Sequence, residues 1–206
     1  MTYFFKTSIP IILLGLSGCS AANVQNLAAD NPSLQTKEAV FAGGCFWCVE
    51  ADFEKLPGVI EAVSGYAGGR TLNPTYKQVG RGGTGHYEVA KIIYDPAKIS
   101  YSQLVEYFWT HVDPTDAGGQ FCDRGHTYKT AIFASPDQIE IAKASKTALQ
   151  NSGRLRDAVV TPIFKSVPFY TAETYHQDYY KKNPIRYKYY RTGCRREARI
   201  KQVWGK

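Results

Sequence analysis

Apolar and polar residues follow two different periods along the chain from about residue 37 onward. Short apolar or alternating runs predict buried strands, because neighbouring side chains of a strand point to opposite faces. These runs lie at 38–42, 59–66, 86–94, 129–134 and 158–164. Apolar residues at helical spacing predict helices at 46–56, 100–112, 138–150 and 171–181. Strands and helices alternate without repeats, so we expect an α+β fold in which a mixed sheet and helices form two layers around one core.

Capping and turn residues mark the boundaries of these elements. Ser100 and Gln103 form a capping-box pattern that starts one helix, and Asp113-Pro114 ends it. The stretch from 67 to 85 is rich in glycine and polar residues, so it predicts an irregular loop. Loops of this length usually carry function.

The first 18 residues resemble an export signal. We do not expect them to belong to the folded domain. Lys6 precedes an apolar run, 8–16, that is too short to anchor the chain in a bilayer. The run ends in Leu16-Ser17-Gly18-Cys19, which resembles the lipobox of bacterial lipoproteins, where cleavage leaves the cysteine lipidated at the new N-terminus. The alternative is an ordinary signal peptide in which Cys19 is incidental.

Lipidation of Cys19 would place the mature protein in the cell envelope. We expect an exported lipoprotein facing the periplasm, and Ser20 at the position after the cysteine favours the outer membrane. Residues 19–36 have no clear period and predict a lipidated N-terminus followed by a flexible tether. Residues 37–206 would then form a single catalytic domain, monomeric, with a basic, tyrosine-rich C-terminal tail.

The formal net charge of +7 comes mainly from that tail. Residues 181–206 hold ten lysines and arginines against one acid, Glu197. Such a segment could bind anionic lipid or nucleic acid. Tyrosines and Trp204 interleave with the basic residues, however, which favours a segment that packs along the domain through its rings. We therefore expect no nucleic-acid partner.

The chain has five cysteines, of which lipidation would use one. Cys45, Cys48, Cys122 and Cys194 then remain in the mature protein. In an oxidising compartment, four cysteines are usually two structural disulfides. The first two form a Cys-x-x-Cys pair among aromatic residues, and this spacing makes redox chemistry the competing interpretation.

Cys45 follows a predicted strand and the bend Gly43-Gly44, and it stands where a predicted helix begins. Unpaired N–H groups and the helix dipole stabilise a thiolate at this position, which lowers the pKa and favours a nucleophile. The alternative is a cysteine that serves only as a small buried hydrophobic residue.

Glu88 lies in a predicted strand on the same face as Ala90, Ile92 and Tyr94. Burial of a carboxyl group without a cation raises its pKa, so Glu88 could stay protonated near neutrality and donate a proton. The strand pattern also allows the alternative, in which Glu88 lies exposed near the strand end or pairs with a lysine.

Six short motifs together resemble one enzyme family, the peptide methionine sulfoxide reductases of the A type. The likeness covers about residues 38–185 and implies an enzyme with a ferredoxin-like plait core that reduces the S epimer of methionine sulfoxide, free or within proteins. The motifs are Gly-Gly-Cys-Phe-Trp at 43–47, Ser-Gly-Tyr-Ala-Gly-Gly at 64–69, Asn-Pro-Thr-Tyr at 73–76, Gly-His-Tyr-Glu at 85–88, Asp-Pro-Thr-Asp at 113–116 and Tyr-His-Gln-Asp-Tyr at 175–179.

The resemblance implies a catalytic role for four residues. Cys45 would attack the sulfoxide sulfur, and Glu88 would protonate the sulfoxide oxygen. Tyr76 and Tyr128 would donate hydroxyl hydrogen bonds to the same oxygen, because a sulfoxide oxygen leaves poorly until it is protonated. The products would be methionine and a sulfenic acid on Cys45.

The same resemblance implies the walls of the substrate pocket. Phe46 and Trp47 would form the apolar surface that receives the methyl group of the substrate. Asp123 would supply a carboxylate that holds the residues in contact with the substrate in place.

A second thiol must then attack the sulfenic acid and form an intramolecular disulfide, which a thioredoxin-like external dithiol reduces without a bound cofactor or metal. Cys48 ranks first, because a Cys-x-x-Cys pair at a helix start closes with little backbone movement. Cys194 ranks second, because family members keep recycling cysteines in this tail. Cys122 ranks third.

Other functions account for fewer of these residues. A thioredoxin-like disulfide oxidoreductase would use Cys45 and Cys48 but not Glu88 or the two tyrosines. Attachment of c-type haem requires histidine where Val49 stands, and a Cys₄ zinc site requires a second close cysteine pair. In a non-catalytic envelope lipoprotein the cysteines would be structural.

Overall fold

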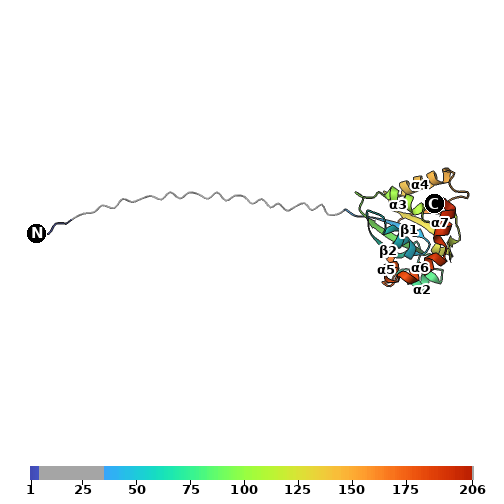
Figure 1. Cartoon of the computed structure of the whole chain (residues 1–206), viewed down its shortest axis with the longest axis horizontal. Coiled ribbons are helices and arrows are strands. Elements are labelled where there is room, and N and C mark those ends of the chain that lie inside the picture. The colour runs from blue at the N-terminus through green and yellow to red at the C-terminus, as the bar shows by residue number, and fades with distance from the viewer. Residues whose placement is uncertain (5–34, 206) are drawn as a thin grey trace. The chain divides into compact units, whose positions relative to one another are not determined.

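The computed structural model describes residues 1–4 and 35–205 (Figure 1). Most of the predicted signal peptide, the predicted lipidation site Cys19 and most of the predicted tether lie outside these residues. The described residues from 35 onward form one compact unit. In the described part of the chain, no helix combines the length and the apolar character needed to cross a membrane.

One six-stranded sheet runs through this unit, with the strand order β7-β6-β1-β3-β2-β8. All neighbouring strands are antiparallel except β6 and β7, so the sheet is mixed as predicted. The strands are β1 (Lys37–Gly43), β2 (Val59–Ala67), β3 (Tyr87–Tyr94), β6 (Thr130–Ala134), β7 (Ile163–Lys165) and β8 (Phe169–Thr171). A separate two-stranded hairpin pairs β4 (Gly119–Gln120) with β5 (Asp123–Arg124).

The helices connect the strands of the sheet and close one of its faces. They are α1 (Phe46–Phe53), α2 (Tyr76–Gly80), α3 (Tyr101–Trp109), α4 (Ile139–Asn151), α5 (Tyr179–Lys182), α6 (Pro184–Gly193) and α7 (Arg196–Trp204), with a 3₁₀ turn η1 (His126–Tyr128). The order β1-α1-β2-β3-α3-β6 with the central strands arranged β6-β1-β3-β2 is the ferredoxin-like plait. The predicted fold class is therefore confirmed.

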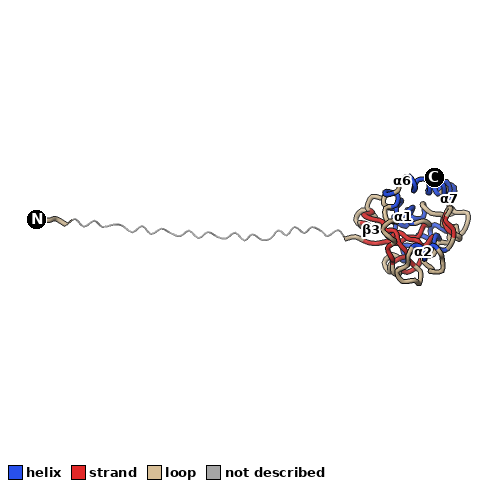
Figure 2. Tube along the Cα trace, turned by 90° about the horizontal axis from the view of Figure 1, so that it is seen from below, coloured by secondary structure: helices blue, strands red, loops and turns tan. Residues whose placement is uncertain are grey.

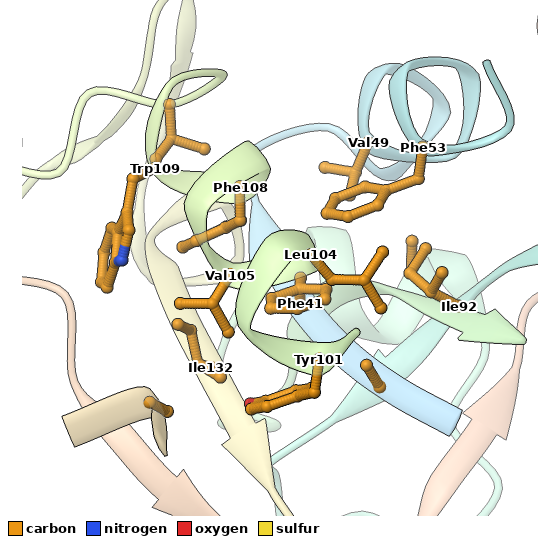
Figure 3. Close-up of a cluster of buried hydrophobic side chains, with 14 of the residues drawn as sticks. Phe41, Val49, Phe53, Ile92, Tyr101, Leu104, Val105, Phe108, Trp109 and Ile132 are labelled. Carbon is orange, nitrogen blue, oxygen red and sulfur yellow. The ribbon is translucent and has the colours of Figure 1, made fainter. Parts of the chain in front are cut away.

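The main core lies between the sheet and the helices α1 and α3 (Figure 3). Phe41 of β1 is fully buried, and its ring stacks on Phe53 of α1 at 5.0 Å and on Phe108 of α3 at 5.1 Å between centroids. Leu149 of α4 and Trp204 of α7 belong to the same cluster. This single apolar layer holds the β1–α1 junction rigidly from one side.

The loop predicted over 67–85 is not irregular throughout, because it contains α2. Thr75 and Gln78 form a capping box at the start of this short helix, as Ser100 and Gln103 do for α3. The same sequence pattern was present at both places, but the surrounding glycines concealed the first.

Two further predicted elements are wrong in the second half of the chain. Residues 171–181 are not one helix, because Phe169–Thr171 pairs with β2 and the Gln177 side chain bonds the backbone of Ser64. The predicted strand 158–164 shrinks to β7, since Val159 N–H donates to the Gln150 side chain, outside any ladder. Long-range partners replaced the local pattern in both segments.

The C-terminal tail folds into two helices, α6 and α7. Figure 2 shows them together near α1, and Tyr190 of α6 contacts the ring of Trp47 edge-on at 5.8 Å. Tyr187 and Trp204 are buried, so the prediction that the tail packs through its rings is confirmed.

Candidate active site

Two glycines shape the bend between β1 and α1. Gly44 has a φ of +86°, and a Cβ atom there would lie 2.7 Å from Cβ of Gln120. A Cβ atom on Gly43 would lie 2.9 Å from Cγ2 of Val49. Cys45 follows as the N-cap of α1, and its carbonyl accepts the N–H groups of Cys48 and Val49. The sequence therefore predicted the position of Cys45 correctly.

A small cavity of about 60 Å³ opens at the side chain of Cys45. All seven residues that the resemblance assigned to catalysis or to the pocket line it, together with one further residue. The lining residues are Cys45, Phe46, Trp47, Tyr76, Glu88, Asp123, Tyr128 and Tyr190.

Only 2% of the Glu88 surface is exposed. Glu88 therefore lies on the buried face of its strand, and the alternative in which it is exposed near the strand end is wrong. Its carboxyl group accepts the N–H of Phe46 at 3.0 Å, directly at the start of α1. Among the described residues no cation forms an ion pair with it. Burial raises the pKa of Glu88 to about 8, and the nearby Asp123 contributes, while the N–H of Phe46 acts in the opposite direction. At neutral pH Glu88 is therefore mainly a proton donor.

The phenol groups of Tyr76 and Tyr128 line the cavity together with the carboxyl group of Glu88. Burial raises the pKa of Tyr76 to about 12, and burial also raises that of Tyr128, so both hydroxyls stay protonated at neutral pH. The Tyr76 and Tyr128 side chains share a hydrogen bond. The backbone of Tyr76 is held by Glu173, whose carboxylate accepts its N–H at 2.8 Å. The cavity thus presents three neutral O–H groups near one thiol.

The thiols of Cys45 and Cys48 are both free, buried and hydrogen-bonded to each other. Burial raises the pKa of Cys45, contrary to the prediction that the helix start would lower it. The hydrogen bond from Cys45 lowers the pKa of Cys48 to about 7, and Arg196 and Arg191 add to this effect. The negative charge of the pair therefore rests on Cys48, because the cations lie on its side.

Those cations belong to a buried ionic cluster around Asp52. Nη1 of Arg191 lies 2.8 Å and Nε of Arg196 lies 3.7 Å from the Asp52 carboxylate. Arg196, 2% exposed, also donates to the carbonyl groups of Gly43 and His111. The basic tail thus packs through guanidinium groups as well as rings, which the sequence analysis did not predict.

The apolar wall of the cavity is held by residues from the end of the chain. The Trp47 ring stacks on Tyr179 with 3.7 Å between centroids, and its N–H donates to Nδ1 of His176 at 3.0 Å. Nε2 of His176 must then carry the hydrogen, and in the structure this buried atom has no hydrogen-bond partner. Burial lowers the pKa of His176, so the ring is neutral.

Tyr190 and His176 are the residues of this site that sequence reasoning missed. The hydroxyl of Tyr190 donates to the Asp123 carboxylate and also contacts the thiol of Cys45. Tyr190 is one of several tyrosines in the tail, and no pattern distinguished it. His176 did stand in a family motif, but the motif alone indicated no role.

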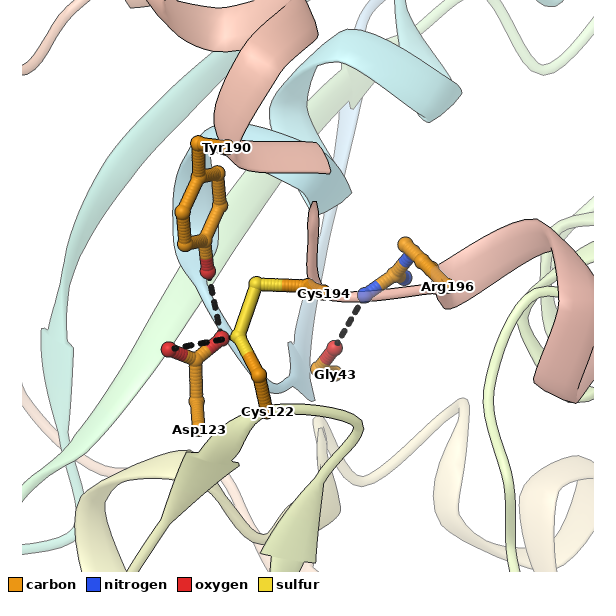
Figure 4. Close-up of a disulfide and its surroundings, with 6 residues drawn as sticks. All are labelled: Gly43, Cys122, Asp123, Tyr190, Cys194 and Arg196. Carbon is orange, nitrogen blue, oxygen red and sulfur yellow. Dashed lines mark hydrogen bonds between the residues drawn. A yellow bond between two sulfur atoms is a disulfide. The ribbon is translucent and has the colours of Figure 1, made fainter. Parts of the chain in front are cut away.

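Cys122 and Cys194 form a disulfide (Figure 4). The bond joins the turn between β4 and β5 to the junction of α6 and α7, across 72 residues of sequence. Asp123, the neighbour of Cys122, carries the hydrogen bond from Tyr190 in the same view. Two of the three candidate resolving cysteines are therefore bonded to each other, whereas Cys48 is a free thiol beside Cys45.

Comparison with known proteins agrees with this geometry. The profile of the family described as peptide methionine sulfoxide reductase matches residues 37–206. Peptide methionine sulfoxide reductase MsrA 2 of Caulobacter vibrioides is 50% identical over 189 residues, which cover 90% of this chain and 95% of that protein. Peptide methionine sulfoxide reductase MsrA of Bacillus subtilis is 52% identical over 168 residues, covering 81% and 95%. The crystal structure of reduced Mxr1 from Saccharomyces cerevisiae aligns with a TM-score of 0.68 at 31% identity, covering 73% of this chain and 87% of that one.

Proposed function

Because this chain belongs to the peptide methionine sulfoxide reductase family and reduces methionine sulfoxide to methionine, we propose a specific division of labour in its cavity. Cys45 is the nucleophile, Glu88 is the acid, and Tyr76 and Tyr128 hold the sulfoxide oxygen. One observation carries the assignment: a buried thiol and three neutral O–H donors line the same small cavity.

The three O–H donors assist the difficult step of the reaction, in which the sulfoxide oxygen, a poor leaving group, is removed from the substrate sulfur. The proton of Glu88 passes to the sulfoxide oxygen, while the two phenols stabilise the charge that develops there. The sulfur of Cys45 attacks the sulfoxide sulfur, and the Cys48 thiolate accepts the proton that Cys45 loses. Methionine and a sulfenic acid on Cys45 result.

The remaining pocket residues position the substrate and the nucleophile. Phe46 and Trp47 receive the methyl group on their apolar surface. Asp123 accepts the hydrogen bond from Tyr190, and this keeps the phenol against the thiol of Cys45.

Cys48 resolves the sulfenic acid that substrate reduction leaves on Cys45. Its thiol attacks the sulfenic sulfur of Cys45, the Cys45–Cys48 disulfide forms, and one molecule of water leaves. Cys48 is placed for this step because it is free, adjacent and partly ionised near neutral pH. An external thioredoxin-like dithiol then returns two electrons, and no bound cofactor is required.

The rival function, a thioredoxin-like disulfide oxidoreductase, leaves most of the cavity unused. It would employ Cys45 and Cys48, but it gives no purpose to a protonated Glu88 or to the paired phenols.

A direct assay tests the proposal. The domain from residue 37 onward is incubated with dithiothreitol and with peptides that carry resolved S or R methionine sulfoxide, and loss of oxygen is followed by mass. We expect turnover of the S epimer alone, and none with Cys45→Ser. Turnover that survives Cys45→Ser would overturn the mechanism. Turnover of the R epimer would overturn the assignment of the pocket.

We further propose that the protein is exported and held in the cell envelope by lipid on Cys19. The pattern Leu16-Ser17-Gly18-Cys19 supports this, and so does the Cys122–Cys194 disulfide, because such bonds persist mainly in oxidising compartments. Cells fed a radioactive fatty acid should label the wild-type chain but not Cys19→Ala. Equal labelling of the two chains, or none of either, would contradict the proposal.

A further inference from the structure

The C-terminal helix α7 is bonded to the segment that follows α3. Nη2 of Arg196 donates to the carbonyl group of His111 at 2.8 Å, and this arginine is 2% exposed. The indole N–H of Trp204 donates to the carbonyl group of Val112 at 2.9 Å. Arg196 is the first residue of α7 and Trp204 is the last, so both ends of the helix are fixed to the domain.

Arg196 also reaches the bend between β1 and α1. Its Nη1 atom donates to the carbonyl group of Gly43 at 3.2 Å, across 153 residues of sequence (Figure 4). A Cβ atom on Gly44 would lie 3.8 Å from the same nitrogen. A guanidinium group is planar and donates in fixed directions, so its two bonds set the distance between the bend and the segment after α3. Cys45 comes directly after this bend.

The positive charge of Arg196 is only partly compensated. Its ion-pair partner Asp52 lies 3.7 Å from Nε, and this nitrogen has no hydrogen-bond partner in the structure. The same carboxylate is bound more closely by Arg191, at 2.8 Å, and Arg191 also pairs with Glu197. The other contacts of the Arg196 guanidinium are two neutral carbonyl groups and the ring of Phe121, 4.5 Å away. A buried cation in this state favours a negative charge nearby.

The thiol of Cys48 is the group on which this charge acts. Cys48 is 2% exposed, and a buried thiolate is unfavourable unless a hydrogen bond or a cation stabilises it. The hydrogen bond from Cys45 is the main cause that lowers the pKa of Cys48, and the charge of Arg196 is the next. Arg191 adds to the effect, and Asp52 opposes it.

The titratable and charged groups that face this thiol come from α1 with its N-cap, β3, α6 and α7. They are Cys45, Asp52, Glu88, Tyr187, Tyr190, Arg191 and Arg196. Of these described groups, only the two arginines are cations. Arg196 is the one of the two that also holds the bend before the nucleophile.

We propose that Arg196 is a positioning residue of this reductase with two roles: its forked hydrogen bonds hold the bend that carries Cys45, and its charge keeps Cys48 ready as the proton acceptor. The inference rests on the proposed function, in which the proton of Cys45 passes to the sulfur of Cys48 as the Cys45 sulfur bonds to the substrate. Arg196 does not line the cavity, so it acts through these two cysteines.

Two substitutions separate the two roles. Arg196→Lys keeps a positive charge but lacks the planar fork, so it cannot hold both carbonyl groups in the same geometry. Arg196→Gln keeps an N–H donor for one carbonyl group but carries no charge. An arginine with a merely structural role would give both variants the same defect at every pH.

The measurement is the rate of the first turnover as a function of pH. The full chain, reduced with dithiothreitol and then freed of it, is mixed with an excess of a methionine S-sulfoxide peptide, and methionine is quantified by mass after rapid quenching. The wild-type rate should rise as the pH passes the Cys48 pKa of about 7. In Arg196→Gln this rise should move about one unit higher, so that the deficit is about tenfold larger near pH 6 than near pH 9.

Arg196→Lys should keep the rise at the wild-type pH. Its rate should be lower by about tenfold at every pH, because the bend is held less precisely. A rise that moves equally in both variants, or in neither, would overturn the proposed role of the charge. A wild-type rate in Arg196→Lys would overturn the role of the fork.

Asp52→Asn tests the sign of the charge effect, even if neither arginine variant folds. The Asp52 carboxylate acts to raise the pKa of Cys48, so loss of its charge should move the rise to lower pH, opposite to Arg196→Gln. A folding defect does not produce shifts of opposite sign. An unchanged profile, or a shift to higher pH, would contradict the electrostatic role.

Arg199→Gln is the matched control. Arg199 also holds α7 to the segment after α3, through Asp113 at 2.7 Å, but it is not among the groups that face the thiol of Cys48. Its profile should match the wild type in position and height. A shift equal to that of Arg196→Gln would trace the effect to loose packing of α7 and would overturn the proposal. A wild type that forms no methionine would instead contradict the proposed function.

Discussion

The molecule contains two cysteine pairs with opposite surroundings. Cys45 and Cys48 lie at the start of α1 beneath the sheet, beside a neutral carboxyl group, phenols and buried arginines. Cys122 and Cys194 join two turns at the surface, next to Arg195, which is exposed, and Arg199, which pairs with Asp113. Thiol chemistry is the same in both places, so the surroundings decide what each pair can react with.

A reductase of this kind has two requirements, of which burial favours the first and prevents the second. Reduction of a sulfoxide requires proton donors that are neutral at pH 7; the phenols of Tyr76 and Tyr128 are neutral there in any case, and burial makes the Glu88 carboxyl group neutral as well by raising its pKa to about 8. Exchange with another protein requires a sulfur at the surface. Cys122 is exposed and meets the second requirement, whereas Cys45 and Cys48 are both buried.

The largest expected effect removes the nucleophile of the buried pair. Cys45→Ser should lower the rate of sulfoxide reduction by on the order of 10⁴-fold or more, because a serine hydroxyl cannot replace a thiol as the attacking group. Mass measurement of methionine formed from a peptide sulfoxide gives the rate.

Cys48→Ser is the informative companion to that variant. It should form one methionine per protein molecule and then stop, since the sulfenic acid is no longer resolved from within the pair. Continued cycling at the wild-type rate would assign the resolving step to the outer cysteines and would remove the proposed distinction between the pairs.

Glu88→Gln tests whether burial makes the carboxyl group an acid. The variant should be slower by about 10²–10³-fold at pH 7, in the range for general acid catalysis. The pKa of Glu88 is raised to about 8, so wild-type kcat/KM should fall as the pH rises through 8 and the donor proton is lost. The variant should lack this fall, and its deficit should narrow above pH 8.

A pH–rate profile of both proteins between pH 5 and about 10 measures the effect. Glutamine still accepts the N–H of Phe46, so the helix start is preserved. Parallel profiles for the two proteins would indicate that Glu88 binds the substrate without donating a proton.

Cys194→Ser probes the structural contribution of the outer pair. The disulfide closes a long loop, and its removal should lower the free energy of unfolding by about 2–4 kcal/mol. Urea unfolding of the oxidised wild type and of the variant gives the difference. In the presence of a strong reductant the two curves should coincide, and a difference that persists there would point to lost packing at the α6–α7 junction.

The smallest expected effect concerns the charge on the buried pair. Arg191→Gln should raise the pKa of Cys48 above its value of about 7, because one of the two cations beside the thiolate is removed. Thiolate absorbance near 240 nm followed during a pH titration reports the change. Arg186→Gln, an exposed arginine on the same helix, is the control and should leave the titration unaltered.

Local patterns predicted the α+β class and the position of the nucleophile, and the family resemblance implied the plait. Alternation located the central strands, helical spacing located α1, α3 and α4, and a strand followed by two glycines placed Cys45 at a helix start. These features depend on neighbouring residues, so the sequence displays them directly. The family resemblance then named seven residues that the structure brings into one cavity.

Prediction was wrong where distant partners replaced local preference. The segment 171–181 has a helical pattern, but the Gln177 side chain bonds to Ser64 of β2, and the backbone N–H of Asp178 donates to the Glu50 carboxylate of α1. The pKa of Cys45 moved opposite to expectation because desolvation outweighs the helix dipole once the thiol is covered. Neither effect can be read from spacing along the chain.

The sequence by itself determined which residues carry the chemistry: a thiol after a double glycine, a strand carboxyl group, and tyrosines in recognisable motifs. Only the tertiary structure decided that Glu88 is buried and protonated, that Tyr190 lines the cavity, that His176 holds the Trp47 ring of its wall, and that Cys122 pairs with Cys194. The physical reason is that protonation, cavity shape and disulfide pairing depend on desolvation and on contacts across many residues of chain, whereas residue type and local period do not.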